Sequence, residues 1–380
     1  MAADISLSEF WDVIVIGAGP AGSAAALRCA QQGLQVLLVD KAFFPRIKVC
    51  GGCLSAHAVE ELKQLVPALR LGHEIQPVRR LRLFAGARQA ALNLSGGGVI
   101  SREALDHQLI QTAVAQGVVF FPGFTATVGA VQDSARLVTL SAPHAQHPMR
   151  ARLVMVADGL AGQALSSQIV APRKVRPAAR VGLGAVVQED GSFYQPETIY
   201  MACGRQGYAG IVRLEDGRLN VAAAVAPEAL RATADPARVI TGILQESSLP
   251  VPQTLSQTPW RGIGPLSSWR QDVAGERFFV LGDAAGYGEP FTGEGMAWAL
   301  MAGRWVAPLA AQAAARWSPD LAAAWRTLYR RKVQKHQRVN RLAAFLLRSP
   351  FWTRVAMNGL SASSTFSRPL IHHVYGGAAA

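Results

Sequence analysis

The chain has 380 residues, half of them hydrophobic, so it is long enough to bury a large core and to form more than one domain. Its four cysteines give no disulfide framework, no run approaches the ~20 apolar residues of a membrane span, and its first ten residues lack the layout of a signal peptide. The formal net charge of +13 comes without a nucleic-acid-binding motif, so we expect a cytoplasmic globular protein that does not bind nucleic acid.

The N-terminal region has the pattern of a dinucleotide-binding unit. The β-branched run 13–16 predicts a buried parallel strand, and the alanine-rich stretch 23–32 predicts a helix after it. Between them, Gly17 permits a tight turn, Gly19 lets the backbone approach a pyrophosphate, and Gly22 allows close packing of helix on strand. The helix N-terminus then offers free N–H groups and a positive dipole end to phosphates.

A second strand is predicted at 35–39, and it ends in Asp40. A carboxylate at this position accepts hydrogen bonds from a ribose 2′-OH and disfavours a 2′-phosphate. The glycine pattern, the flanking strands and the acid together predict an adenine dinucleotide. The alternative is a tight turn that binds no ligand.

Two cysteines, Cys50 and Cys53, have the spacing of a redox dithiol. A helix starting near 54–58 would place the pair at its N-terminus and lower a thiol pKa. A zinc site is disfavoured, because Cys29 and Cys203 do not form a second paired-ligand motif, and we expect no metal. The remaining alternative is that these thiols fill a tight turn as small apolar side chains.

The short alternating strands farther along the chain predict a second domain. Examples occur at 80–84, 180–187 and 218–225. We expect an antiparallel sheet that covers the cofactor and leaves a substrate cavity between the domains. The expected dinucleotide-binding domain is discontinuous, with a mainly parallel sheet and helices on both faces. Its segments would be 8–75, 98–172 and 270–310, and the substrate domain would comprise 76–97 and 173–269.

A second glycine-rich element suggests which dinucleotide binds. In residues 281–286, Asp283 follows a predicted strand, and Gly293-Glu294-Gly295 opens a helix soon after it. The first glycine cluster indicates only that a dinucleotide can bind, whereas this element, some 260 residues later, indicates FAD.

The C-terminal region is strongly basic. Eleven Lys or Arg residues and one acid, Asp320, lie between Arg304 and Arg354, and this segment carries +10 of the net charge. The segment 311–375 reads as C-terminal helices with an aromatic, apolar face. Such helices can contact anionic lipid, as a peripheral membrane protein does, or an acidic carrier protein. The alternative is a solvated helix face packed on the core through its aromatic residues.

Four motifs, in their order and spacing, resemble those of flavoproteins with the aromatic-hydroxylase fold. This superfamily includes geranylgeranyl reductase-like enzymes, flavin monooxygenases and flavin-dependent halogenases. The resemblance covers roughly 11–305 and implies an α/β fold with a discontinuous Rossmann-type FAD-binding domain, an inserted antiparallel β-sheet substrate domain and a helical C-terminus. The motifs are 44–52, 101–106, 154–159 and 282–295.

The resemblance also implies roles for individual residues. Arg46 and Arg102 would lie near the cofactor phosphates and ribityl chain, and Asp283 would bind the ribityl hydroxyls. The start of the helix at Gly295 would face the flavin pyrimidine ring, where reduced flavin is negative. The alternative for Arg102 is a surface position on an ordinary capped helix. The expected FAD-binding residues are Gly17, Gly19, Pro20, Ala21, Gly22, Asp40, Lys41, Arg46, Cys50, Gly51, Arg102, Ala126, Asp158, Gly159, Gly282, Asp283, Pro290, Gly293, Glu294, Gly295 and Met296.

Two departures from the family pattern, and two partial matches to reductase motifs, bear on the reaction. Hydroxylases carry Ser and Arg after the Asp-Gly dipeptide where this chain has Gly162 and Leu165, which puts direct NAD(P)H docking there in doubt. The reductant stays open between NAD(P)H and a separate reduced flavin or electron donor. The Trp-x-Trp motif of halogenases is absent, which disfavours halogenation. Residues 48–53 resemble the reductase motif Lys-Pro-Cys-Gly-Gly-Gly, and 207–213 keep the Tyr of a second reductase motif.

We therefore expect an FAD-dependent oxidoreductase that acts on an apolar or aromatic small molecule. The reaction is either monooxygenation or ene reduction, which the sequence does not separate. Candidate catalytic residues are Cys50, Tyr208, Tyr287 and Glu289. The alternative is a flavoprotein that carries electrons or binds a partner without chemistry of its own on a small molecule.

Overall fold

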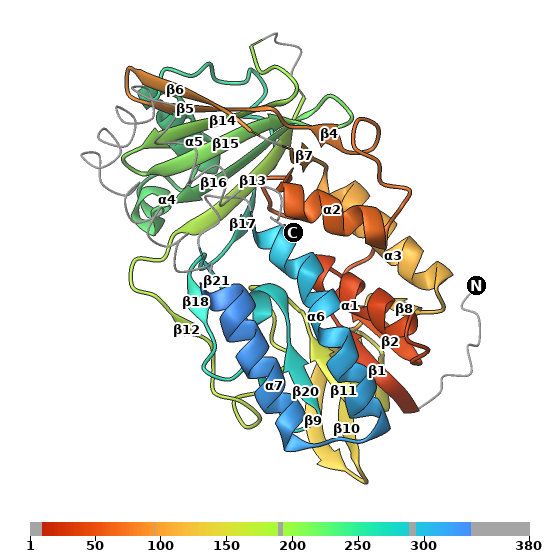
Figure 1. Ribbon diagram of the computed structural model, residues 1–380. Coiled ribbons are helices and arrows are strands. Elements are labelled where there is room, and N and C mark those ends of the chain that lie inside the picture. Colours follow the sequence, from red (N-terminus) through yellow and green to blue (C-terminus); the bar gives the residue numbers. More distant parts are fainter. Residues whose placement is uncertain (1–9, 95, 189–192, 289–293, 336–380) are drawn as a thin grey trace.

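The computed structural model describes residues 10–94, 96–188, 193–288 and 294–335 (Figure 1). Its first domain contains an eight-stranded sheet. Six of its strands have the order β19-β20-β11-β1-β2-β8; the other two, β10 and β9, continue from β11 as antiparallel neighbours, β10 pairing with β11 and β9 with β10. β1 pairs in parallel with β2 and with β11, so the predicted parallel core is confirmed. The strands are β1 (Phe10–Ile16), β2 (Val36–Asp40), β8 (Val119–Pro122), β9 (Thr125–Gln132), β10 (Ala135–Ala142), β11 (Ala145–Val156), β19 (Ala274–Gly275) and β20 (Phe278–Val280).

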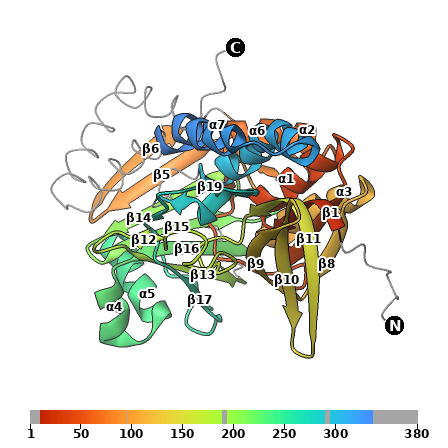
Figure 2. The ribbon, with the colours of Figure 1, turned by 90° about the horizontal axis from the view of Figure 1, so that it is seen from below.

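The sheet is covered differently on its two faces. Helices lie on one side, and the β9–β10 hairpin lies on the other, with β9 also against β2 (Figure 2). The expectation of helices on both faces was therefore wrong, because a β-hairpin can bury the same apolar surface through alternate residues such as Val138 and Leu140. The helices of this domain are α1 (Pro20–Ala30), α2 (Ala56–Leu65), α3 (Arg102–Ala115), α6 (Gly295–Ala315) and α7 (Pro319–Tyr329), followed by a π-helical turn η2 (Arg330–Gln334).

Two contacts fix the C-terminal helices on this core. A Cβ on Gly303 of α6 would lie 2.6 Å from the backbone carbonyl carbon of Ala24 in α1. The two helices are therefore so close at this point that only glycine fits. The fully buried Trp325 of α7 donates its indole N–H to the carbonyl of Val280 at 3.2 Å. Helix α6 runs through residue 310, where the sequence placed a boundary, because its alanine-rich face continues unbroken to Ala315.

The second domain is a seven-stranded sheet with the order β17-β13-β16-β15-β14-β5-β6. Both inserted segments contribute strands to it, and α4 (Pro227–Thr233) and α5 (Pro236–Glu246) belong to the same domain. The sheet is not wholly antiparallel as expected, because β14 pairs in parallel with β5. These two strands come from different insertions, so no hairpin fixes their relative direction. The strands are β5 (Arg80–Ala85), β6 (Arg88–Asn93), β13 (Val181–Val187), β14 (Thr198–Gly204), β15 (Gly207–Arg213), β16 (Leu219–Val225) and β17 (Arg261–Ile263).

Two small sheets of three strands complete the described fold. One has the order β3-β7-β4 and the other β12-β18-β21. The second of these brings together the strand that precedes the main part of the second domain (β12), the strand that follows it (β18), and β21, which lies beside the short 3-10 helix η1 (Gly282–Ala284). The strands are β3 (Cys53–Leu54), β4 (Gln76–Pro77), β7 (Gly98–Val99), β12 (Lys174–Val175), β18 (Ser268–Trp269) and β21 (Gly286–Tyr287).

Candidate active site

The turn between β1 and α1 is built from glycines for steric reasons. Gly17 has a φ of +103°, and a Cβ there would collide with the carbonyl oxygen of Ala157. A Cβ on Gly22 would collide with the carbonyl oxygen of Gly17, so helix and turn need both glycines. Gly19 is different, because its Cβ position faces side chains only at 3.7 Å or beyond. The backbone of Gly19 is therefore open to a ligand.

Two cations converge on Gly19. From the position of a Cβ on that residue, Nη2 of Arg102 is 3.7 Å away and Nζ of Lys48 is 4.0 Å away. Burial, and then the neighbouring Arg102 guanidinium, lower the pKa of Lys48, while Asp283 acts in the opposite direction. A helix N-terminus with two cations beside it has the chemistry of a diphosphate site. Sequence reasoning did not select Lys48, although its position between Arg46 and Cys50 was a usable signal.

Arg102 is held by a buried ion pair. Its Nε and Nη2 donate to the two carboxylate oxygens of Asp106 at 2.9 and 2.8 Å. Burial lowers the pKa of Arg102, but Asp106 and then Cys50 act in the opposite direction, and the pKa stays above its usual value. Arg102 is 9% exposed and Asp106 is fully buried, so the alternative of a surface position was wrong. Ser101 caps the helix as expected, accepting a hydrogen bond from the backbone N–H of Ala104 at 3.1 Å.

Asp40 and Arg46 extend this network along the end of β2. Nη2 of Arg46 lies 3.8 Å from Asp40 and 3.7 Å from Asp106. The Asp40 carboxylate accepts hydrogen bonds from the backbone N–H groups of Ala18 at 2.8 Å and Ala42 at 2.9 Å. Asp40 thus holds the glycine turn in place, and its contact with a ribose stays a prediction.

The Asp158-Gly159 pair forms the wall beside Lys48. The Asp158 carboxylate accepts from the N–H of Ala164 at 2.9 Å, and burial raises the pKa of Asp158. A Cβ on Gly162 would collide with that carboxylate, which explains in steric terms why this position has no side chain. A Cβ on Gly159 would lie 3.5 Å from Nζ of Lys48, so the lysine contacts both glycine turns of the domain.

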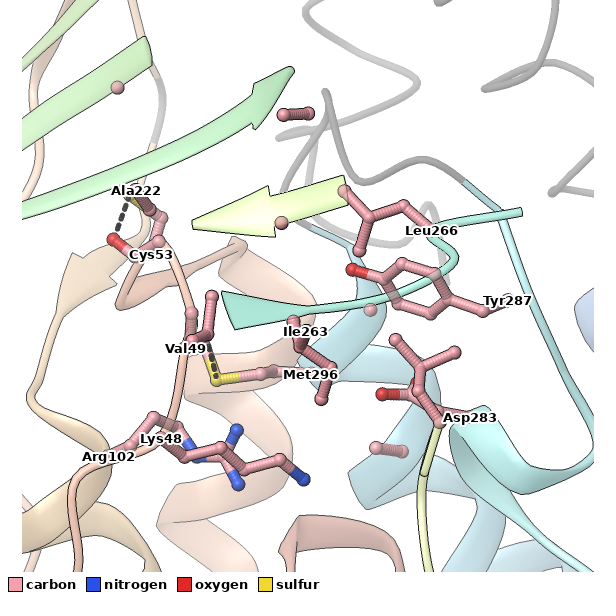
Figure 3. A pocket seen from close by; sticks show the side chains of 18 of the residues that line it. Lys48, Val49, Cys53, Arg102, Ala222, Ile263, Leu266, Asp283, Tyr287 and Met296 are labelled. Carbon is pink, nitrogen blue, oxygen red and sulfur yellow. Dashed lines mark hydrogen bonds between the residues drawn. The ribbon is translucent and has the colours of Figure 1, made fainter. Parts of the chain in front are cut away.

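Asp283 faces the two cations from the opposite side of the cavity. Figure 3 shows Lys48 and Arg102 pointing toward the space that Asp283 borders. Burial raises the pKa of Asp283, whereas Lys48 and then Arg102 lower it. Gly282, with a φ of +56°, turns the chain so that Asp283 reaches this position. The arrangement places a carboxylate where polyol hydroxyls could donate hydrogen bonds.

The loop that carries Cys50 connects the two domains. Nδ2 of Asn220, on β16 of the second sheet, donates to the carbonyl of Cys50 at 2.9 Å. The Cys50 Sγ lies 3.9 Å from Sδ of Met296 at the start of α6. Sequence reasoning did not select Asn220, because its partner is 170 residues away and is a backbone carbonyl.

The dithiol interpretation gains no support from this loop. Sγ of Cys53 donates to the carbonyl of Gly51, whereas Sγ of Cys50 accepts from the N–H of Gly52. Figure 3 shows the Cys53 side chain on the side of the loop away from Met296. Burial, and then the proximity of Cys50, raise the pKa of Cys53 to about 12, so its thiolate is disfavoured. The two thiols are free.

A single cavity joins these groups and extends under the second sheet. Its empty space is about 1530 Å³, open solvent included, and it is lined from Gly19 to Ala299 by both domains. The floor carries the polar groups described above. The roof is apolar and built partly from small residues. Because their side chains are short, they leave space in the cavity beneath strands β13, β16 and β15. Roof residues include Leu81, Gly182, Ile199, Gly210, Val212 and Ala222.

Three of the four candidate catalytic residues line this cavity. They are Cys50, Tyr208 and Tyr287. Tyr208 is 6% exposed and lies under the guanidinium of Arg180, whose carbon is 5.4 Å from the ring centre. Tyr287 lies beside Leu266 at the other end of the labelled group (Figure 3). The fourth candidate, Glu289, lies outside the described residues, so its role stays a prediction.

Apart from Gly17, Gly22, Asp40, Arg46 and Asp158, which belong to the turns and ion pairs described above, the predicted FAD-binding residues divide into three groups. Cavity-lining positions are Gly19, Pro20, Ala21, Cys50, Gly51, Arg102, Gly159, Gly282, Asp283, Gly295 and Met296. Lys41 is exposed, Ala126 lies on β9 and Glu294 is buried at the start of α6, and none of these lines the cavity. Pro290 and Gly293 lie outside the described residues. Among the described residues, no group of His, Cys, Asp and Glu could hold a metal, and none of their helices is long and apolar enough to cross a membrane.

The described residues fit FAD at its phosphate end. The glycine cradle, the open backbone of Gly19, and the Lys48 and Arg102 side chains beside it suit a diphosphate, and Asp283 suits a polyol chain. Solved structures with the same fold include a flavin-dependent brominase, with a TM-score of 0.78 at 16% identity over 97% of this chain and 94% of that one. A geranylgeranyl bacteriochlorophyll reductase-like protein from Thermoplasma acidophilum has a TM-score of 0.74 at 20% identity over 96% of each chain. These structures show the fold, and the reductase relatives found by sequence make the protein a flavin-dependent oxidoreductase.

Sequence comparison places the chain more narrowly. A family model described as lycopene cyclase protein matches residues 12–202, and the chain belongs to that family. It is 29% identical to the menaquinone reductase of Mycobacterium tuberculosis over 367 residues, which are 91% of this chain and 86% of that protein. It is 27% identical to digeranylgeranylglycerophospholipid reductase 2 of Methanopyrus kandleri over 315 residues, which are 80% of this chain and 77% of that protein.

Proposed function

We propose that the protein binds FAD and reduces a carbon–carbon double bond of a long apolar substrate. The cavity carries this proposal, because its floor is polar and its roof is apolar and extends under the second sheet. An uncharged hydrocarbon bound under that roof would be removed from water, and no polar group of the hydrocarbon would lose its hydrogen bonds to water. Similarity to the menaquinone reductase and to the archaeal lipid reductase supports reduction over oxygenation.

The described residues would hold FAD at three points. Lys48, Arg102 and the first N–H groups of α1 would bind the diphosphate. Asp283 would accept hydrogen bonds from the ribityl hydroxyls. The N-terminus of α6 at Gly295 would stabilise negative charge on the pyrimidine side of the ring. Bound FAD, once reduced, supplies a hydride to the substrate.

Saturation of a double bond also needs a proton at the second carbon. The hydride goes to one carbon, the proton goes to the other, and the double bond becomes a single bond. Side chains that could hold this proton at the cavity are the phenols of Tyr287 and Tyr208 and the thiol of Cys50. Cys50 and Tyr287 both lie at the start of α6 and are therefore the first candidates. Sγ of Cys50 is 3.9 Å from Sδ of Met296, and the Tyr287 ring is 4.0 Å from the Cβ position of Gly295.

The electrons would come from a separate donor rather than from a pyridine nucleotide seated at the Asp158 loop. Two features support this part of the proposal. Position 162 has no room for a side chain beside Asp158, and Leu165 is buried at 8% exposure. Neither residue can supply the polar contacts that a nucleotide phosphate requires.

The test is anaerobic and uses the FAD-loaded protein after chemical reduction. It would be mixed with isoprenoid alkenes of increasing length, including a prenylated naphthoquinone. We expect the flavin to reoxidise as one double bond gains two hydrogen atoms, measured by absorbance and mass spectrometry. Product that gains oxygen only when air is admitted, with no saturated product, would instead establish monooxygenation and overturn the proposal.

A further inference from the structure

Strand β12 places cations beside the cavity. Lys174, Val175 and Arg176 are all exposed, with Val175 49% exposed. The guanidinium carbon of Arg176 lies 4.9 Å from the ring centre of Trp269 on β18. In the described part of the chain, neither Lys174 nor Arg176 has a carboxylate within 4 Å. The strand therefore offers positive charge together with exposed apolar surface.

A second basic segment follows α7. Arg330, Arg331, Lys332 and Lys335 are exposed, while Val333 between them is buried. The segment 330–335 contains no acid, and the described residues give none of these four cations an ion pair within 4 Å. Their charges are therefore available to an external partner.

The two segments, about 155 residues apart in sequence, border the same small sheet. β12 pairs with β18, and β18 pairs with β21, which holds Gly286 and Tyr287. The hydroxyl of Tyr329, the residue before Arg330, lies 3.5 Å from the Cβ position of Gly286. Figure 1 shows the C-terminal end of α7 beside β18 and β21. Both sets of cations thus lie next to the end of the cavity that Tyr287 lines.

We propose that a cationic rim, made of Lys174, Arg176, Arg330, Arg331, Lys332 and Lys335, binds the protein to an anionic phospholipid bilayer. The Tyr287 end of the cavity would then face the leaflet, and the substrate would enter the cavity from the bilayer. This inference rests on the proposed function to the extent that the substrate is apolar.

Lipid fits the rim better than an acidic protein does. Charge complementarity alone would suit either partner, but Lys174 on β12 and Arg176 just after it flank the exposed Val175, and Trp269 lies beneath Arg176. Small apolar side chains among cations can enter the headgroup region while the charges meet lipid phosphates. Each Lys or Arg near an anionic membrane strengthens binding about fivefold, and the effect falls off within a Debye length.

The experiment is vesicle co-sedimentation of the full FAD-loaded chain. We expect binding to phosphatidylcholine vesicles that contain phosphatidylglycerol, release by added salt, and no binding to pure phosphatidylcholine. The rim variant changes Lys174, Arg176, Arg330, Arg331 and Lys332 to Gln. Since five cations are removed, binding should weaken by at least about 100-fold. Flavin content and the thermal midpoint should stay unchanged.

A matched control removes five exposed arginines elsewhere and so reaches the same net charge. These are Arg80, Arg88, Arg205, Arg231 and Arg238. The control should still bind vesicles. Equal loss of binding in control and rim variant would show a nonspecific charge effect and overturn the proposal. So would wild-type protein that ignores anionic vesicles or that binds only an acidic protein such as a ferredoxin.

A second readout separates this inference from the proposed function. Reduction of a substrate embedded in vesicles should fall in the rim variant, whereas reduction of the same substrate in neutral detergent should not. If vesicles bind through the rim but no alkene is reduced under either condition, the docking surface stands and the proposed reaction fails. An equal fall in vesicles and in detergent would overturn the docking role.

Discussion

The surroundings of Lys48 disfavour its charged form in the ligand-free protein. Burial and then Arg102 lower its pKa, whereas Asp283 and, after it, Asp106 act in the opposite direction. A lysine whose pKa falls on folding binds protons less tightly in the folded state than in the unfolded state. Its contribution to the free energy of unfolding is therefore fully present above the unfolded pKa and is lost as pH falls through the folded pKa. Below its unfolded pKa, Lys48 therefore costs the ligand-free protein stability unless an anion binds beside it.

The first prediction follows from this cost. Lys48→Met should leave the thermal midpoint of the ligand-free protein unchanged or raised, because a buried charge is replaced by an apolar side chain of similar length. The same change should weaken FAD binding by about 10- to 100-fold, the loss expected for one charge-assisted hydrogen bond. Fluorescence titration of the stripped protein with FAD measures the affinity, and calorimetry measures the midpoint.

The control for this prediction is Lys48→Arg, which keeps the charge. It should bind FAD more tightly than Lys48→Met. A large fall in the ligand-free midpoint of Lys48→Met, with FAD affinity intact, would show that Lys48 acts as a structural residue rather than as a phosphate ligand.

At the residue scale, the sequence predicted what depends on local backbone geometry. Gly17 and Gly22 lie where turn and helix leave no room for a Cβ, and a glycine pattern records such constraints directly. Lys48 and Asn220 were not selected, because their roles depend on partners far along the chain. A single lysine or asparagine has no local pattern that distinguishes a buried contact from a solvated one.

Helices α1 and α6 show how one small residue sets the distance between two elements. A Cβ on the buried Gly303 would lie 2.6 to 2.8 Å from backbone atoms of Ala24 and Ala25. Because these are backbone atoms, a side chain at 303 cannot be accommodated by rotation. The close approach matters to the site, since α1 begins at the phosphate turn and α6 begins beside Met296.

Gly303→Ala should therefore destabilise the protein by about 1–3 kcal/mol, the usual cost of overpacking. It should also loosen FAD, because both helix N-termini contribute to its site. Thermal unfolding followed by circular dichroism, together with flavin release on gel filtration, would measure the two effects.

A glycine in another helix gives the opposite expectation. Gly242 lies inside α5, is exposed, and has no atom within 4 Å of its Cβ position. Gly242→Ala should stabilise the protein by about 0.5–1 kcal/mol through helix propensity. Stabilisation by both alanines would contradict the close packing of α1 on α6.

At the element scale, strands with a clear hydrophobic pattern could be predicted from the sequence. The predicted strand at 218–225 and the observed β16 (Leu219–Val225) differ by one residue at one end. The direction of β5 against β14 could not be predicted, because the two strands pair across more than 100 residues without a connecting turn. The sequence did not predict that the β9–β10 hairpin covers one face of the parallel sheet. A hydrophobic strand pattern shows that one side of a strand is buried, but not against which other element it packs.

At the scale of the whole molecule, the sequence predicted two domains with a cavity between them, and it did not predict how they are joined. The segment 48–53 was expected to pass near the flavin. Two contacts of this segment depend on how the second sheet lies over the first domain. They are the hydrogen bond from Asn220 of β16 to Cys50 and the packing of Val49 against Gly184 of β13. Such interdomain contacts follow from the three-dimensional arrangement and leave no periodic signal in either segment.

Asn220 acts as a positioning residue between the domains. Its amide donates to the Cys50 carbonyl at 2.9 Å, and Cys50 in turn lies against Met296 at the start of α6. The hydrogen bond thus fixes the substrate sheet relative to the loop that lines the reacting end of the cavity. A shift of about 1 Å in such a contact can reduce a rate by as much as 100-fold, because hydride transfer requires close alignment of the reacting atoms.

Asn220→Ala should therefore lower kcat by about tenfold or more, with FAD affinity nearly unchanged, because the phosphate and ribityl contacts lie in the other domain. Loss of this part-buried hydrogen bond should cost about 0.5–1.5 kcal/mol of stability. The exposed Asn93, at the end of β6, is the control, and Asn93→Ala should change neither quantity. Single-turnover reoxidation of the reduced flavin by substrate measures the rate without product release. If Asn220→Ala lowered stability but left that rate at the wild-type value, the residue would be structural. The two domains would then keep their alignment through other contacts, such as the hydrogen bond from the Ser101 N–H to Glu215 and the packing of Val49 against Gly184.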